Sequence, residues 1–209
     1  MKRINTEFLE RTFFFCVAIL ILASCSKNEK RFFLSDWQFS EGDIVFRRGI
    51  GAKSTAVLRV DKEGLYSHVG IIVKLDSVFM VVHITPGERE KGETEDRIKI
   101  EAPELFFCPF KAQSGAVIRL KDSLEYAEMA AHEAYRLFQQ VILFDHNYLL
   151  EDTTKMYCTE LIWRSYLSGN KDITQGRRSV LENFPLFSGT YIFPSDIYVN
   201  DEFSLIYNY

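Results

Sequence analysis

The chain has 209 residues, with 29 acidic and 25 basic side chains, so its formal net charge near pH 7 is −4. This length suits one domain with a single core and a modest tail. The acidic balance argues against a nucleic-acid partner, because phosphate recognition needs clustered lysine and arginine.

Residues 1–24 are typical of an export signal, which we exclude from the fold. Three basic side chains in the first eleven residues precede an apolar run from Phe13 to Ala23, which is too short to span a bilayer as a helix. The sequence Leu22-Ala23-Ser24-Cys25 resembles the lipobox of bacterial lipoproteins, which implies cleavage before Cys25 and its lipidation. We expect residues 25–36 to form a tether and 37–209 a periplasm-facing domain of the cell envelope, anchored in a membrane. An uncleaved N-terminal anchor is the alternative.

The first half of the domain reads mainly as strands. We expect a strand at Gly42–Arg47, a short helix at Ser54–Val60, a hairpin of His68–Lys74 with Val78–Ile84, a charged loop at Thr85–Asp96, and strands at Arg97–Glu101 and Ala116–Leu120.

Two clear helices follow in the second half. Apolar positions at helical spacing predict a helix over Ser123–Gln140, with Ser123 or Asp122 as its cap. A second helix starts near Cys158 and ends at Gly169, where glycine suits a left-handed cap. We expect the tail from Asn183 to be irregular, with one strand. The pattern indicates an α+β fold, an antiparallel sheet packed against helices.

The register of the hairpin decides where two histidines lie. A tight loop pairs residues whose numbers sum to 153, so His83 faces Gly70 and shares a sheet face with His68, about 7 to 8 Å away at Cα. The opposite face is then continuously apolar. A slip by one residue would separate the two histidines, so we prefer this register.

Cys158 begins the apolar stripe of its helix, which continues at i+3, i+4, i+7 and i+8. Unpaired N–H groups and the helix dipole favour a thiolate there and are expected to lower the thiol pKa. A small buried hydrophobe is the plain alternative. With Cys16 in the signal and Cys25 lipidated, Cys158 could also form a disulfide with Cys108 in an oxidising compartment.

Cys158, His68 and His83 together suggest a Cys-His-polar triad for acyl transfer. The same residue types bind zinc, but no close ligand pair such as Cys-x-x-Cys is present, so we assign no metal and no cofactor. His132 lies on the polar side of the long helix and is expected to be solvated. His146 lies in a loop and receives no role.

Three segments resemble the circularly permuted papain-like amidases of the YaeF/YiiX group, relatives of the NlpC-type cysteine peptidases. They are Gly42-Asp43-Ile44-Val45-Phe46-Arg47, Tyr66-Ser67-His68-Val69-Gly70-Ile71-Ile72-Val73 and Tyr157-Cys158-Thr159-Glu160-Leu161. The resemblance implies a permuted papain-like α+β core, with Cys158 as nucleophile and His68 as base.

The third polar residue departs from the group's pattern, which often has glutamate where this chain has His83. Lecithin retinol acyltransferase-like relatives do use a second histidine there. The resemblance also makes Tyr198 and Tyr157 candidate site-lining residues.

We therefore expect an envelope cysteine hydrolase that cleaves an amide bond in peptidoglycan peptides or a related small amide. The first alternative is a lipid acyltransferase or thioesterase of the lecithin retinol acyltransferase-like type, with an apolar groove from Phe184, Phe187 and Phe193. The second is a non-catalytic envelope lipoprotein.

Overall fold

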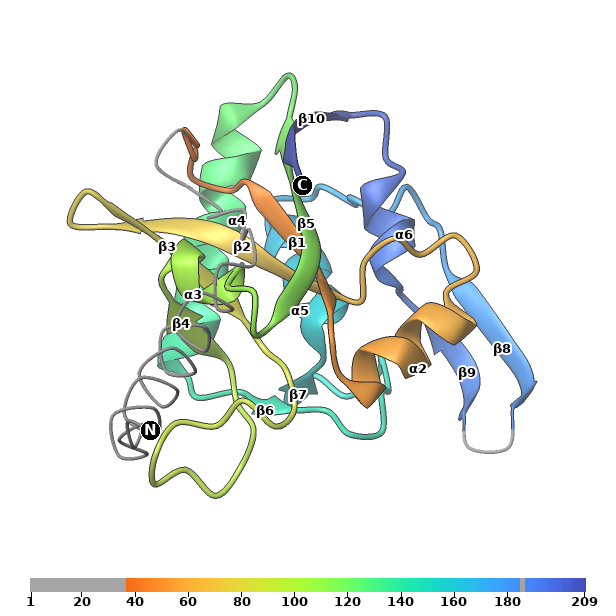
Figure 1. Cartoon of the computed structure of the whole chain (residues 1–209). Helices are drawn as coiled ribbons and strands as arrows, with labels where there is room; N and C mark the ends of the chain where they lie inside the picture. The colour runs from red at the N-terminus through yellow and green to blue at the C-terminus, as the bar shows by residue number, and fades with distance from the viewer. Residues whose placement is uncertain (1–36, 185–186) are drawn as a thin grey trace, which may run out of the picture. The chain divides into compact units, whose positions relative to one another are not determined.

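The computed structural model describes residues 37–184 and 187–209, and in that part of the chain a six-stranded antiparallel sheet runs in the order β10-β5-β1-β2-β3-β4 (Figure 1). Its strands are β1 (Ile44–Gly49), β2 (His68–Leu75), β3 (Val78–His83), β4 (Lys99–Glu101), β5 (Ala112–Leu120) and β10 (Phe203–Asn208). The mixed α+β class with an antiparallel sheet is confirmed.

The helices are α2 (Ala52–Val60), α3 (Pro103–Phe106), α4 (Leu124–Gln139), α5 (Cys158–Leu167) and α6 (Pro194–Tyr198). Figure 1 shows α4 and α5 behind the sheet, and both contact β2 as well as each other. They cover the apolar face of the hairpin, where Val69, Ile71 and Val73 are buried against alanines of α4 and Leu161 and Ile162 of α5. This packing fixes the start of α5 beside β2.

The hairpin has the predicted register. Gly70 pairs with His83 and Lys74 with Phe79, so paired residue numbers sum to 153. Its two-residue loop, Asp76-Ser77, has positive φ at both positions (44° and 72°), which matches the twist of the flanking strands. The predicted grouping of both histidines on one face is therefore confirmed.

The helix ends differ from the predictions. Ser123 precedes α4 but makes no side-chain cap; its hydroxyl donates to the Asp122 carbonyl instead. Helix α5 ends at Leu167, and the left-handed residue beyond it is Asn170 (φ 62°) rather than Gly169. Asparagine tolerates this conformation because its short polar side chain can hydrogen-bond locally.

The C-terminal tail is more regular than predicted. Strands β8 (Ser179–Phe184) and β9 (Phe187–Tyr191) form a hairpin, α6 follows, and β10 pairs with β5 at the edge of the main sheet. Pairing with distant β5 supplies the order that local sequence did not reveal. A short parallel pair, β6 (Leu143–Phe144) with β7 (Lys155–Met156), leads into α5.

The signal segment 1–24, the proposed lipid-bearing Cys25 and the tether 25–36 lie outside the described residues. Within the described residues, no helix combines the length and apolar character needed to cross a bilayer.

Candidate active site

Two histidines meet where β2 begins and β3 ends. Nε2 of His68 lies 2.9 Å from Nδ1 of His83, and both rings are buried. Phe106 of α3 packs against both rings, at centroid distances of 5.6 and 5.2 Å. Gly70 leaves room for this pair, because a Cβ there would lie 2.6 Å from a Val81 methyl and 3.2 Å from Cβ of His83.

Cys158 lies beside β2, near the point where the pairing of β2 with β3 ends. The register would pair Val69 with Ile84, but pairing ends at His83. The backbone N–H of Val69 instead lies close enough to the Cys158 thiol to act on its pKa, in the lowering direction. Cys158 is free, and although the residue as a whole is partly exposed its thiol is buried, near the residue that follows His68. The structure therefore joins His68 to His83 directly and places Cys158 near Val69, the residue that follows His68.

Burial dominates the electrostatics of the thiol. It raises the pKa of Cys158 to about 11, although the N–H groups of Val69, Thr159 and Cys158 itself, and the charge of Arg47, act in the opposite direction. The prediction of a lowered thiol pKa is therefore wrong, because desolvation outweighs the contribution of the helix start. The resting side chain of Cys158 is therefore a thiol.

Burial also keeps both imidazoles neutral. It lowers the pKa of His68 well below its usual value, and the positive charge of Arg47 adds to the shift. The pKa of His83 falls to about 4, again mainly through burial, although the bond to Glu101 opposes the shift. At pH 7 the site therefore consists of a neutral thiol and two neutral imidazoles.

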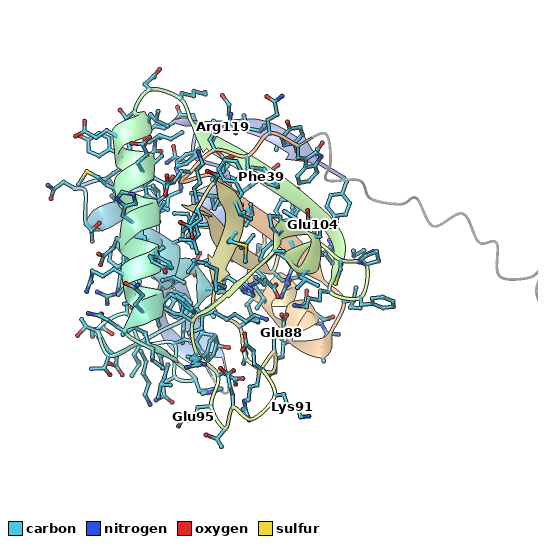
Figure 2. All side chains as sticks on the ribbon, turned by 90° about the vertical axis from the view of Figure 1, so that its left-hand side faces the viewer. Phe39, Glu88, Lys91, Glu95, Glu104 and Arg119 are labelled. Atoms are coloured by element: carbon cyan, nitrogen blue, oxygen red, sulfur yellow. The ribbon has the colours of Figure 1, made fainter. Side chains whose placement is uncertain are left out.

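Sequence reasoning missed a charged cluster behind the histidines. Glu101 accepts a hydrogen bond from His83, with Oε1 3.0 Å from Nε2. The remaining members share ion pairs with one another or with Glu101; they are Arg47, Glu88, Lys99 and Lys111. Glu88, one member of this cluster, is labelled in Figure 2. The pairing of Lys99 with His83 places β4 here, and a three-residue edge strand gives too weak a pattern to reveal that register.

One ammonium group lies between the two carboxylates of this cluster. Nζ of Lys111 is 2.7 Å from Oε2 of Glu101 and 2.8 Å from Oε2 of Glu88. One possible ligand atom from each of His83, Glu88 and Glu101 lies within 4.8 Å of the other two, which is close enough for the three residues to contact a single metal ion.

The other two histidines lie away from this site. His132 has a side chain that is 77% exposed, which agrees with the predicted solvation. His146 is 64% exposed and lies 3.7 Å from Asp96.

Cys108 and Cys158 are both free thiols, so the alternative of a disulfide between them is not what the structure shows.

The two candidate tyrosines have structural contacts. The Tyr157 hydroxyl accepts the backbone N–H of Ile192. Tyr198 packs edge-on against Phe46 and Tyr66, at 5.3 and 5.0 Å between ring centroids. These contacts direct both rings into the packing around α6.

Of the phenylalanines considered for an apolar groove, Phe193 is buried and stacks on Tyr191. The side chains of Phe184 and Phe187 lie outside the described residues.

Comparison with known proteins finds similarity among solved structures, but not among family models or curated sequences. No family model matches the chain, and no curated protein matches it. A solved structure described as metalloprotein yiiX from Escherichia coli O157:H7 has a TM-score of 0.65 and 18% sequence identity, covering 83% of this chain and 99% of that one. At this identity the likeness concerns the fold alone, and the chain has a YiiX-like α+β fold.

Proposed function

We propose that this protein is a cysteine hydrolase of the permuted papain-like type that cleaves an amide bond. The observation that carries the proposal is the free Cys158 thiol at the start of α5, close to the backbone N–H of Val69, which directly follows His68 of the buried His68–His83 pair. Nucleophile, base and orienting group are the three parts that acyl transfer through cysteine requires.

In the proposed reaction the Cys158 sulfur attacks the carbonyl carbon while His68 accepts the thiol proton. The C–N bond then breaks, and His68 returns that proton to the leaving amine, which leaves a thioester on Cys158. His68 next removes a proton from water, whose oxygen attacks the thioester carbon. The thiol leaves with the proton, and the carboxylic acid is released.

The start of α5 also supplies a hydrogen-bond donor for the oxyanion. First-turn backbone N–H groups have no partner within a helix, and the N–H of Cys158 belongs to that turn. The charge of Arg47 acts on the same sulfur and favours negative charge there. Both groups would stabilise charge that develops during attack.

The substrate class rests on the sequence. We place it among peptidoglycan peptides or related small amides, because the N-terminal segment indicates export and the motifs resemble cell-wall amidases. The lipid anchor on Cys25 would hold the enzyme at a membrane facing this substrate.

A metal centre fits this chain poorly, although the structural neighbour is described as a metalloprotein. Both carboxylates that could bind a metal already bind Lys111 and Lys99, and Arg47 pairs with Glu88. With neutral histidines, three positive and two negative side chains leave the cluster with a net charge of +1. That charge repels a divalent cation, and the proposed reaction needs none.

The test is turnover of peptidoglycan-derived peptides by the purified full chain, followed by mass spectrometry. Cys158→Ala should abolish turnover, whereas Cys108→Ala, the matched control, should retain it. A thioester adduct on the peptide that contains Cys158 should be trapped by acid quenching. Equal turnover by wild type and Cys158→Ala would remove the assignment.

A further inference from the structure

Two hydrogen bonds link His68 to His83 and His83 to Glu101, and the donor of each can be assigned. An ionised carboxylate can only accept hydrogen bonds, so Nε2 of His83, 3.0 Å from Glu101, must carry the ring proton. A neutral imidazole has one ring proton, and Nδ1 of His83 is therefore an acceptor.

The same reasoning extends one residue further. Nδ1 of His83 lies 2.9 Å from Nε2 of His68, so Nε2 of His68 must donate. Nδ1 of neutral His68 then has a free lone pair, which is what a base for the Cys158 proton needs. The order of donors along this path follows from the negative charge at Glu101.

Lys111 keeps Glu101 in the accepting state. Its ammonium lies between the two carboxylates, within 2.8 Å of each, and Lys99 adds a contact of 3.4 Å to Glu101. An ammonium group has only donors. Lys111 thus occupies the position between carboxylates that a divalent ion would need, and it directs Glu101 Oε1 to His83 as an acceptor.

We infer that Glu101 is a positioning residue that sets the tautomers of both His83 and His68, with Lys111 as an internal cation in place of a metal. Its catalytic consequence rests on the proposed function of Cys158 and His68. The tautomers themselves are a property of the resting protein and are measured without substrate.

The first experiment is two-bond ¹H–¹⁵N correlation NMR on the full chain labelled with ¹⁵N-histidine. We expect the proton on Nε2 in both His68 and His83. Assignment uses His68→Gln and His83→Gln, each of which removes one set of signals. A proton on Nδ1 of His83 in the wild type would overturn the inference without any Glu101 variant.

The second experiment is Glu101→Gln. Lys111 should attract the amide oxygen, which leaves the NH₂ group facing Nε2 of His83. Both histidines should then change to the Nδ1–H tautomer, and turnover should fall by about 10³- to 10⁴-fold, as expected when a catalytic imidazole has the wrong tautomer. In Glu101→Gln with Lys111→Met the amide can turn its oxygen to His83, so the Nε2–H tautomers and part of the activity should return.

Glu104→Gln is the matched control, because Glu104 is exposed on α3 (Figure 2) and should leave tautomers and turnover unchanged. Unchanged tautomers in Glu101→Gln would contradict the inference. So would stoichiometric zinc that shifts the His83 signals in wild type but not in Glu88→Gln, since that would show a metal centre. If Cys158→Ala retained turnover, the proposed function would fail while the tautomer result would stand.

Discussion

Raising the pH should increase the rate at which iodoacetamide alkylates Cys158 by about tenfold per unit between pH 6 and 9. The reason is that burial raises the pKa of this thiol to about 11, from an ordinary value of 9.0. Only the thiolate reacts, and at pH 7 about one Cys158 in 10⁴ is ionised, compared with about one in 10² for an ordinary thiol.

The thiolate fraction alone would make Cys158 about a hundredfold slower than an ordinary thiol. A more basic thiolate is also a better nucleophile, and a Brønsted coefficient of about 0.4 to 0.5 returns roughly a factor of eight. We therefore expect net alkylation at pH 7 about tenfold slower than for the same thiol in the unfolded chain.

The assay is timed alkylation of the native full chain, with mass spectrometry of the peptide that contains Cys158. The reference is the same peptide from chain alkylated in denaturant. A rate that stays constant from pH 6 to 9 would refute the reasoning, because it would indicate a thiolate–imidazolium pair already formed at rest.

Three further outcomes follow from the structure. His68→Ala should lower turnover by about 10²- to 10⁴-fold by removing the base, while exposed His132→Ala should not change it; similar losses in both would contradict the assignment. Burial lowers the pKa of His83 from its ordinary value of 6.5 to about 4 in the folded protein. The unfolded chain therefore takes up a proton at this residue before the folded protein does, so the contribution of His83 to stability is complete above pH 6.5 and is lost as the pH falls to 4. Calorimetry should then show the free energy of unfolding falling across that window, with about 3 kcal/mol of the fall due to His83 and a further part due to buried His68, and His83→Gln should remove only the His83 part. Gly42→Ala should destabilise the fold by about 2 to 4 kcal/mol in denaturant unfolding, because φ is +82° and a Cβ would lie 2.4 Å from the Ala127 carbonyl oxygen. Gly176→Ala, with φ +76° and open space around it, should cost only about 1 kcal/mol, and equal losses would sink the steric argument.

Local sequence patterns were enough to predict the local geometry of the site. Alternation of apolar residues and a tight loop determined the hairpin register, and the register placed His83 on the face of His68. Helical spacing placed Cys158 at the head of a buried stripe. These features were predictable because each depends on neighbours close in the chain.

The charge state of the site and the partners of its residues depend on contacts between segments that are distant in the chain. Glu101 reaches His83 only because β4 pairs with β3, and Lys111 reaches Glu101 from the turn just before β5. The thiol pKa of Cys158 rises rather than falls because packing removes water from it, and no local pattern measures desolvation. The tail likewise gains its order from pairing of β10 with β5, a contact between segments far apart in the chain.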